Sequence, residues 1–307
     1  MGLPNARRIG RVLFLCSVMV LAGCGGSSDS GGGMTQIGGA IQGKALALTG
    51  VSSTLAGKAD ISTDGTGAAA VFNNPYGITT DGTNLYVADT YYHTIRKVVI
   101  ATGAVTTLAG SSGASGSTDG AGAAARFNEP AAITAVGADL YVADSKNHTI
   151  RRVVIATGAV TTLAGSAGAS GSTDGAGAEA RFSNPNGITT DGTSLYVADS
   201  DNNTSRKAVL ATGVVTTLAG TAGSSGSTDG AGSAARFNRP WGITTDGTNL
   251  YVADYNNHTI RKVVIATGEV TTLAGAAGSL GSTDGAGSAA RFNRPRGITT
   301  DGTNLYV

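Results

Sequence analysis

Short apolar runs separated by turn residues recur along this chain at a fixed spacing. Within residues 77–110, four such runs cover 78–80, 85–88, 94–100 and 105–109. Runs of this length, rich in Val, Ile, Thr and Tyr, predict β-strands. The connections at 81–84 and 101–103 contain Asp, Asn and Gly, which supply the positive φ that tight hairpins need. The stretch therefore predicts an up-and-down antiparallel sheet of four strands.

The same stretch is copied along the chain. The string Leu-Tyr-Val-Ala-Asp ends at Asp89, Asp144, Asp199 and Asp254, and each copy follows the last by 55 residues. One small sheet cannot bury both of its faces, and repeats of roughly 40 to 50 residues with four strands each are typical of propeller blades. The fold class predicted is all-β: a β-propeller built of four-stranded antiparallel blades.

One copy carries a family resemblance. Residues 240–262, Pro-Trp-Gly-Ile-Thr-Thr-Asp-Gly-Thr-Asn-Leu-Tyr-Val-Ala-Asp-Tyr-Asn-Asn-His-Thr-Ile-Arg-Lys, resemble an NHL repeat, and the copies that begin at Pro75, Pro130 and Pro185 match it closely. The resemblance implies a β-propeller, commonly of six blades. It leaves function open, because the family includes ligand-binding, scaffold, sensor and RNA-binding domains as well as lyase-like and lactonase-like relatives, and a fold does not determine a function.

The last copy is incomplete. It begins at Pro295, and the chain stops at Val307, inside the second strand of the unit. We therefore expect a chain truncated at its carboxyl end, with four complete blades and a partial fifth within residues 51–307. A lone copy of the fourth strand, at 51–57, is suited to completing a terminal blade in a closed ring, since closure removes exposed strand edges. The sequence as it stands predicts an open arc or a strained small ring.

The first 23 residues have the pattern of a bacterial lipoprotein signal peptide. Arg7, Arg8 and Arg11 precede an apolar stretch at 12–21, which is too short to span a bilayer. Leu-Ala-Gly-Cys24 then resembles a lipobox, which implies lipidation of Cys24. Residues 24–50 begin with a Gly and Ser-rich run, so we expect a flexible, lipid-anchored tether. An uncleaved anchor or an ordinary signal peptide is the alternative.

The resemblance to bacterial sorting signals also predicts a location. Gly25, rather than Asp, follows Cys24. By that resemblance, the mature protein is expected on the outer membrane, on its periplasmic or cell-surface face, with the lipid as its only contact with the membrane.

Charge and cysteine content exclude several chemistries. Removal of residues 1–23 takes away three arginines and leaves 18 basic against 20 acidic residues. No basic footprint for nucleic acid remains. Cys16 leaves with the leader and Cys24 is acylated, so no thiol is left for a disulfide, a zinc site or a nucleophile.

Two repeated features are candidate metal ligands. His93, His148 and His258 occupy one slot of the unit, which Asn203 fills in the third copy. Equivalent slots lie on different blades, too far apart for several ~2 Å bonds to one zinc ion, so a structural role is favoured. The linking segments each carry an aspartate among glycines, such as Asp119, and calcium is the functional alternative. One carboxylate falls short of the six to eight oxygens that calcium takes. We therefore expect no cofactor and no metal ligands.

Candidate binding residues come from the slots that vary between copies. The slot after the proline holds Tyr76, Ala131, Asn186, Trp241 and Arg296, and the slot before it holds Asn74, Glu129, Asn184, Arg239 and Arg294. The loop after the second strand, with Tyr91 and Tyr255, also varies. Because the first strand of a blade is the innermost, these loops are expected to ring one mouth of the channel, where binding sites are common. Neutral variation on an exposed rim is the alternative.

The functional prediction follows from these slots and from what is missing. No catalytic constellation of nucleophile, base or phosphate loop is present. The sequence favours a non-enzymatic binding or scaffold module that engages a protein, peptide or glycan at the channel mouth. The alternative is a lactonase-like or lyase-like enzyme with a metal in the central channel.

Overall fold

The computed structural model describes residues 54–56, 58–59 and 62–307. The leader, Cys24 and the tether lie outside these residues. Four antiparallel sheets follow one another along the described chain, and each has the order predicted, with the first strand of the unit innermost. The all-β propeller prediction is confirmed.

The strands repeat with nearly constant bounds. In the first two blades they are β4 (Pro75–Thr80), β5 (Asn84–Asp89), β6 (Thr94–Val99), β7 (Ala104–Gly110), and β9 (Pro130–Val136), β10 (Asp139–Asp144), β11 (Thr149–Val154), β12 (Ala159–Gly165). In the next two they are β14 (Pro185–Thr190), β15 (Ser194–Asp199), β16 (Thr204–Val209), β17 (Val214–Gly220), and β19 (Pro240–Thr245), β20 (Asn249–Asp254), β21 (Thr259–Val264), β22 (Glu269–Ala274). A partial unit ends the chain with β23 (Thr299–Thr300) and β24 (Leu305–Tyr306).

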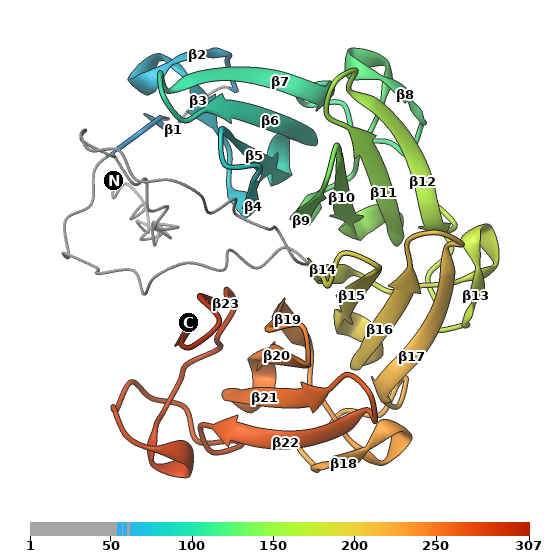
Figure 1. Ribbon diagram of the computed structural model, residues 1–307, viewed down its shortest axis with the longest axis vertical. Coiled ribbons are helices and arrows are strands. Elements are labelled where there is room, and N and C mark those ends of the chain that lie inside the picture. Colours follow the sequence, from blue (N-terminus) through green and yellow to red (C-terminus); the bar gives the residue numbers. More distant parts are fainter. Residues whose placement is uncertain (1–53, 57, 60–61) are drawn as a thin grey trace, which may run out of the picture.

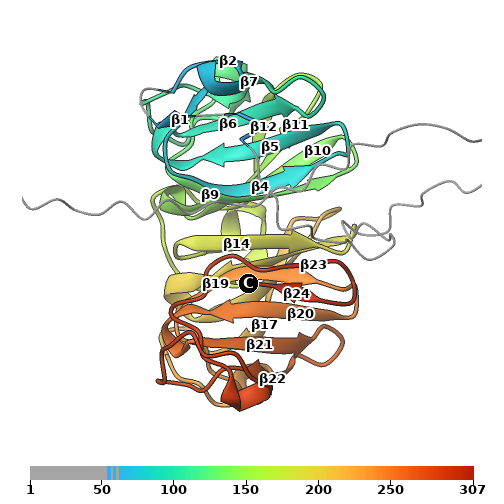
Figure 2. The ribbon, with the colours of Figure 1, turned by 90° about the vertical axis from the view of Figure 1, so that its left-hand side faces the viewer.

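The blades form an open arc around a channel (Figure 1). The inner strands β4, β9, β14 and β19 face the channel, while β7, β12, β17 and β22 lie on the outside. Figure 2 looks into the open side, with β4 on one flank and β23 on the other. The open arc was one of the two predicted outcomes.

Each sheet has a fifth strand that the apolar pattern does not predict. Two-residue strands from the linking segments pair with the outer strands: β2 (Gly65–Thr66), β8 (Gly120–Ala121), β13 (Gly175–Ala176) and β18 (Gly230–Ala231). A three-residue 3₁₀ helix follows each of them: η1 (Gly67–Ala69), η3 (Gly122–Ala124), η5 (Gly177–Glu179) and η7 (Gly232–Ala234). A Gly-Ala pair has no periodicity, so only pairing with the neighbouring strand makes it β.

The start of the described chain adds one more pairing. β1 (Lys58–Ala59) runs parallel to β3 (Val71–Phe72). Leu55 and Ala56 pack on the core of the first blade, as Leu108 packs on the core of the second. Residues 51–53 and 57 of the predicted lone strand lie outside the described residues.

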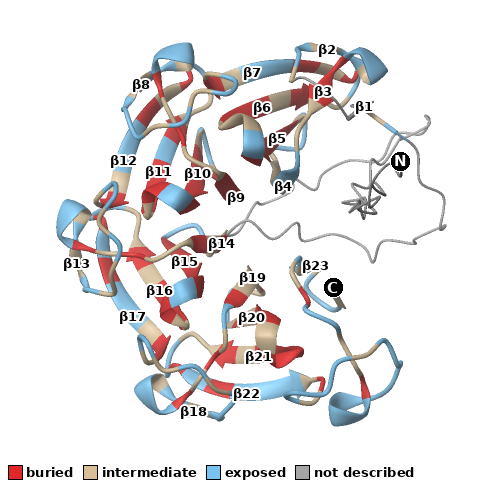
Figure 3. Cartoon of the chain, turned by 180° about the vertical axis from the view of Figure 1, so that it is seen from behind, coloured by how far each residue is buried: buried red, intermediate tan, exposed pale blue. Residues whose placement is uncertain are grey.

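The core lies between the blades as well as within them (Figure 3). Phe127, which is fully buried, packs with Tyr86 and Ile95 of the first blade and Leu140 and Val142 of the second. Phe182 and Phe237 do the same at the next two junctions. These phenylalanines thus fill the space between neighbouring blades. Burying a side chain of this size contributes about 1.5 to 3 kcal/mol.

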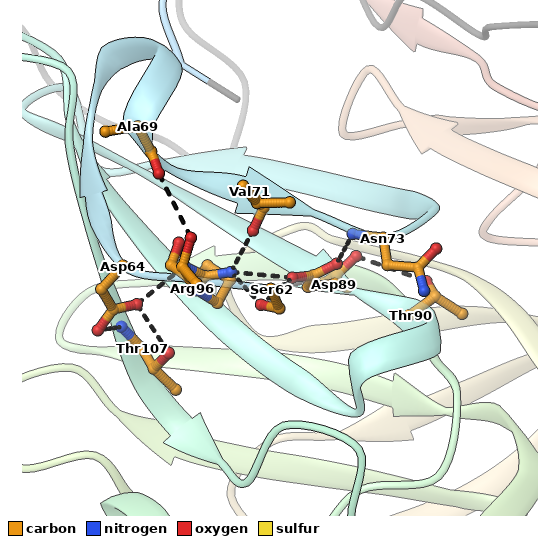
Figure 4. Close-up of polar contacts among 11 residues, drawn as sticks. Ser62, Asp64, Ala69, Val71, Asn73, Asp89, Thr90, Arg96 and Thr107 are labelled. Carbon is orange, nitrogen blue, oxygen red and sulfur yellow. Dashed lines mark hydrogen bonds and ion pairs between the residues drawn. The ribbon is translucent and has the colours of Figure 1, made fainter. Parts of the chain in front are cut away.

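A buried arginine closes each blade onto its linking segment. In the first blade, the Arg96 guanidinium pairs with the carboxylates of Asp89 at 3.0 Å and Asp64 at 2.8 Å (Figure 4). It also lies 5.0 Å from the centre of the Phe72 ring. Asp64 in turn accepts hydrogen bonds from the backbone N–H and hydroxyl of Thr107. The same network recurs around Arg151, Arg206 and Arg261. The repeated Asp and Arg are therefore scaffold residues.

Candidate functional site

The loop that enters each inner strand has an unusual backbone. The residue before each proline adopts the left-handed conformation, with φ between 50° and 57°: Asn74, Glu129, Asn184, Arg239 and Arg294. Few residues other than Gly adopt this region without cost, and Asn is among the best tolerated. The five slots that vary in sequence therefore share one demanding conformation, which aims each side chain the same way relative to its blade.

Side chains from the preceding blade hold this loop in place. The backbone N–H of Glu129 donates to Nδ1 of His93 at 3.1 Å, and the N–H of Asn184 donates to Nδ1 of His148 at 3.2 Å. At the third junction, Oδ1 of Asn203 accepts from the Arg239 N–H at 2.8 Å, and at the fourth, His258 accepts from Arg294 at 3.0 Å. The histidines thus act as neutral acceptors that tie neighbouring blades together. Burial lowers the pKa of His93 and of His148, which favours this neutral form.

A second bond fixes the proline at three of the four junctions. The hydroxyl of the residue after the buried aspartate donates to the proline carbonyl of the next blade, as Thr90 does to Pro130 at 2.8 Å and Ser200 to Pro240 at 2.5 Å. Ser145 bonds to Pro185 in the same way. In the fourth blade, the residue after the buried aspartate is Tyr255. Tyr255 therefore corresponds to Thr90 of the first blade, and Tyr91 lies one position further along its loop.

Glycines after the variable slot let the inner strands approach closely. A Cβ on Gly187 would lie 2.1 Å from the Trp241 carbonyl oxygen, and a Cβ on Gly242 would lie 2.1 Å from that of Arg296. Neither position has room for a side chain, so glycine is required for this packing. The close approach brings the variable residues of adjacent blades together.

Six of the predicted residues form one cluster, which we call the mouth cluster: Tyr76, Arg239, Trp241, Tyr255, Arg294 and Arg296. Trp241 is at its centre, with the Tyr255 ring at 5.3 Å and the Tyr76 ring edge-on at 6.5 Å. The guanidinium of Arg296 lies 4.9 Å from the Trp241 ring, and that of Arg239 lies 5.6 Å from it. Arg294 lies over Tyr255 at 5.8 Å. Residues from the first, fourth and partial fifth units thus meet across the channel.

A pocket of about 180 Å³ adjoins the mouth cluster. Asn186 and Tyr91, the other two predicted residues, line it together with Tyr76, Arg239 and Trp241. Glu129, Lys146 and Asn184 also line it. Glu129 and Asn184 belong to the variable slot before the proline, whereas Lys146 is not among the candidate residues given above. Lys146 lies in the variable loop after the second strand, and that variation was the signal that could have found it. The geometry therefore joins all the candidate side chains into one surface; a binding role remains a prediction.

Tyr255 differs from expectation, because it is buried rather than a free loop side chain. Burial alone raises the pKa of its phenol, but a hydrogen bond from Arg296 and the charges of Arg296, Arg294 and Arg239 outweigh this and hold the pKa below its usual value. The three arginines around Tyr255 therefore favour the ionised form of its phenol.

Potential metal-ligating side chains are not grouped together among the described residues. Within the ranges given above, no group of three or more His, Cys, Asp or Glu side chains is placed to hold one. The carboxylate of Asp119, the candidate calcium ligand, pairs with Arg151 at 2.7 Å and accepts from Thr162 at 3.1 Å. Among these same residues, no helix is long and apolar enough to cross a membrane.

Comparison with known proteins identifies the repeat. Residues 237–263 match the model of the NHL repeat. NHL repeat-containing protein 2 of Homo sapiens is 30% identical over 280 residues, which cover 80% of this chain and 38% of that protein. The chloroplastic protein SUPPRESSOR OF QUENCHING 1 of Arabidopsis thaliana is 29% identical over 262 residues, covering 80% of this chain and 25% of that protein. The chain thus spans well under half of the length of these relatives.

Solved structures are similar in fold. A crystal structure of a nidogen/laminin complex aligns with a TM-score of 0.53 at 18% identity, covering 76% of this chain and 71% of that chain. Virginiamycin B lyase from Staphylococcus aureus aligns with a TM-score of 0.50 at 16% identity, covering 77% of this chain and 64% of that one. The sequence and structural matches together support an NHL-repeat propeller.

Proposed function

We propose that this NHL-repeat propeller is a non-enzymatic binding scaffold whose mouth cluster and adjoining pocket recognise a protein, peptide or glycan. The observation that carries the proposal is the contrast between a nearly invariant frame and one divergent surface. The buried Asp and Arg residues repeat in every complete blade, and a Phe precedes the proline of each, whereas the slots that meet at the channel mouth hold aromatic, amide, acidic and basic groups. Trp, Tyr and Arg side chains that pack together and are only partly accessible, as Trp241 and Arg296 are, are typical of binding hot spots.

The packing around Trp241 supports a preorganised surface. Two guanidinium groups and two tyrosine rings surround its indole. Such contacts reduce the number of rotamers that must be frozen on binding, and this lowers the entropic cost of association.

A variant of Trp241 tests the proposal. Ligands are first sought with peptide-phage and glycan-array screens of the full chain. Trp241→Ala should then weaken binding by about 2 kcal/mol or more, as at other hot spots. Thr216→Ala, on the exposed outer strand β17, is the matched control and should bind as the parent does. Normal binding by a folded Trp241→Ala variant would place the recognition surface elsewhere.

We further propose that the scaffold is displayed as an outer-membrane lipoprotein anchored through Cys24, and that it binds no nucleic acid. The support is the leader and lipobox pattern together with the charge balance of the chain without its leader. The structural likeness to a lyase is a likeness of fold, so the enzyme alternative has no specific observation in its favour.

A further inference from the structure

The arginines of this protein fall into groups that differ in how many hydrogen bonds their guanidinium groups donate. Arg151, of the buried network, donates to two carboxylates and to two backbone carbonyls, and its side chain is fully buried. Arg126, of the linking segment, donates to the carbonyls of Ala123 and Ala125. Each of these groups is explained by the scaffold.

The arginines of the mouth cluster are not explained in that way. Within residues 62–307, the Arg294 guanidinium has no hydrogen-bond acceptor and contacts the Tyr255 ring. Arg239 makes one long, half-exposed ion pair with Asp201 at 3.4 Å, and Arg296 donates to the Tyr255 hydroxyl at 3.4 Å. A guanidinium stacked on an aromatic ring keeps its N–H edges free for a planar, bidentate partner such as a carboxylate.

The backbone conformation indicates that Arg239 and Arg294 are not there to stabilise the fold. Arg239 and Arg294 occupy the left-handed slot at φ 57° and 54°, where the first and third copies have the better tolerated Asn74 and Asn184. The bond that stabilises this loop uses the backbone N–H, so the scaffold does not need the arginine side chains. Glu129 fills the same slot in the second copy, so all three charged residues of this slot have a steric cost that their side chains do not offset through a bond to the loop.

The junction between the fourth and fifth units also differs from the other three, beside the same arginines. Tyr255 replaces the Ser or Thr that bonds to the next proline at the other three junctions, and its phenol meets Arg296 instead. An inter-blade hydrogen bond is thus given up at the one junction where two arginines of the mouth cluster follow. The tyrosine gives Arg294 and Arg296 a ring to stack on.

We infer that the mouth cluster binds an acidic saccharide: its arginines pair with a uronate carboxylate while the adjoining pocket holds the sugar. This inference rests on the proposed function and names its ligand class. The pocket suits a sugar because it is polar and open, with Asn184, Asn186, Glu129 and Lys146 on its walls. Tyr76 and Tyr91, 38% and 49% exposed, also line the pocket and supply accessible aromatic surface on which the C–H side of a pyranose can pack. The mouth cluster and pocket together hold more basic than acidic side chains: Lys146, Arg239, Arg294 and Arg296 against Glu129 and Asp201.

An oligosaccharide array with neutral counterparts tests this inference. The full chain is applied to oligogalacturonates, oligomannuronates and glucuronate-containing oligosaccharides, each beside its carboxyl-reduced form, which keeps every hydroxyl and loses only the charge. The hits are titrated by calorimetry at two salt concentrations. We expect at least one uronate to bind tenfold or more tighter than its reduced form, and to bind more weakly at the higher salt concentration.

Variants locate the contact. Arg294→Ala and Arg296→Ala should each weaken the uronate roughly tenfold to hundredfold, since a hydrogen bond between charged groups contributes that much. Arg296→Lys should recover only part of the loss, because a lysine keeps the charge but not the bidentate fork. The control is Arg152→Ala, which removes an equal charge from a half-exposed ion pair on β11. It should bind normally, and thermal melts confirm that each variant is folded.

The outcomes separate this inference from the proposed function. Equal binding of acidic and reduced sugars, lost in Trp241→Ala, would overturn the acidic ligand and leave the mouth as the recognition surface. Uronate binding that Arg152→Ala weakens as much as Arg296→Ala would overturn the assigned site. Absence of any uronate binding would overturn the inference, while a peptide hit sensitive to Trp241→Ala would still support the proposed function.

Discussion

Arg151 and Arg152 are neighbours on β11, and their replacement by methionine tests the buried networks that hold the blades together. The Arg151 side chain is fully buried; that of Arg152 is 46% exposed and pairs with Asp139 at 2.7 Å. Methionine has a similar length and removes only the charge and the donors. The two variants therefore share chemistry and strand, and differ in which face of the sheet they alter.

The structure sets the size of the effect. Arg151→Met leaves Asp144 fully buried without its cation and removes one hydrogen bond each from the carbonyls of Thr118 and Arg126. It also removes a guanidinium that lies 5.3 Å from the Phe127 ring. Breaking a buried ion pair by removing one partner costs about 3 to 5 kcal/mol. Arg152→Met removes an exposed pair, which contributes about 0 to 1 kcal/mol.

The pH dependence gives an independent check with a definite sign. Burial raises the pKa of Asp144 to about 6 against the lowering by Arg151, and loss of Arg151 raises it further. A carboxyl whose pKa is higher in the folded than in the unfolded state binds its proton on folding, so stability increases as the pH falls through the folded pKa. The deficit of Arg151→Met relative to Arg152→Met should therefore shrink between pH 8 and pH 5.

Urea unfolding measures both effects. Circular dichroism follows the sheets, and fluorescence follows Trp241, the only tryptophan of the chain. Coincident transitions justify a single free energy of unfolding. A difference between the two variants of less than about 1 kcal/mol at pH 8, with unchanged m-values, would refute the argument that the buried arginines hold the blades.

Three further predictions concern the histidine slot, the linking segments and the amino terminus. His148→Asn, which copies the natural Asn203, should match the parent in stability at pH 8 and exceed it at pH 5: burial and then the Lys146 charge lower the pKa of His148 in the folded state, so the parent loses stability as the pH falls from about 6.5 through that lowered value. Parallel urea midpoints at all pH values would contradict this. Exchange of calcium for a chelator should leave the melting temperature unchanged, since Asp119 is already paired with Arg151. A rise of several degrees in calcium would reverse that conclusion. Cys24→Ala should abolish labelling by a radioactive fatty acid in the native host, and persistent labelling would count against the lipoprotein assignment.

Much of the fold could be predicted because the chain repeats. Equal spacing of the apolar runs predicted the blades and their strand order, since both depend on a local periodicity that every copy repeats. The short strand β8 could not be predicted in this way, because a Gly-Ala pair has no pattern and becomes β only through its partner β12.

The residues of the candidate site could be predicted from the sequence, but the contacts between them could not. Divergence between copies selected Tyr76, Trp241 and Arg296, but their contact depends on how the arc brings its first and fourth blades together, which no local pattern encodes. The left-handed conformation of Arg239 could not be predicted from the sequence either, because arginine is not a residue typical of turns. The burial of Tyr255 follows from the arginines that cover it, which come from the next unit.

Hydrogen–deuterium exchange of the full chain, with and without the tightest ligand from the screens, tests the central claim that the channel mouth is the recognition surface. We predict slower exchange in the bound state at residues 73–76, 90–93, 184–186, 238–241 and 293–296, where the variable slots lie. The outer strands β7, β12, β17 and β22 should exchange at the same rate in both states. Protection confined to those outer strands, with the loops of the mouth unchanged, would contradict the claim.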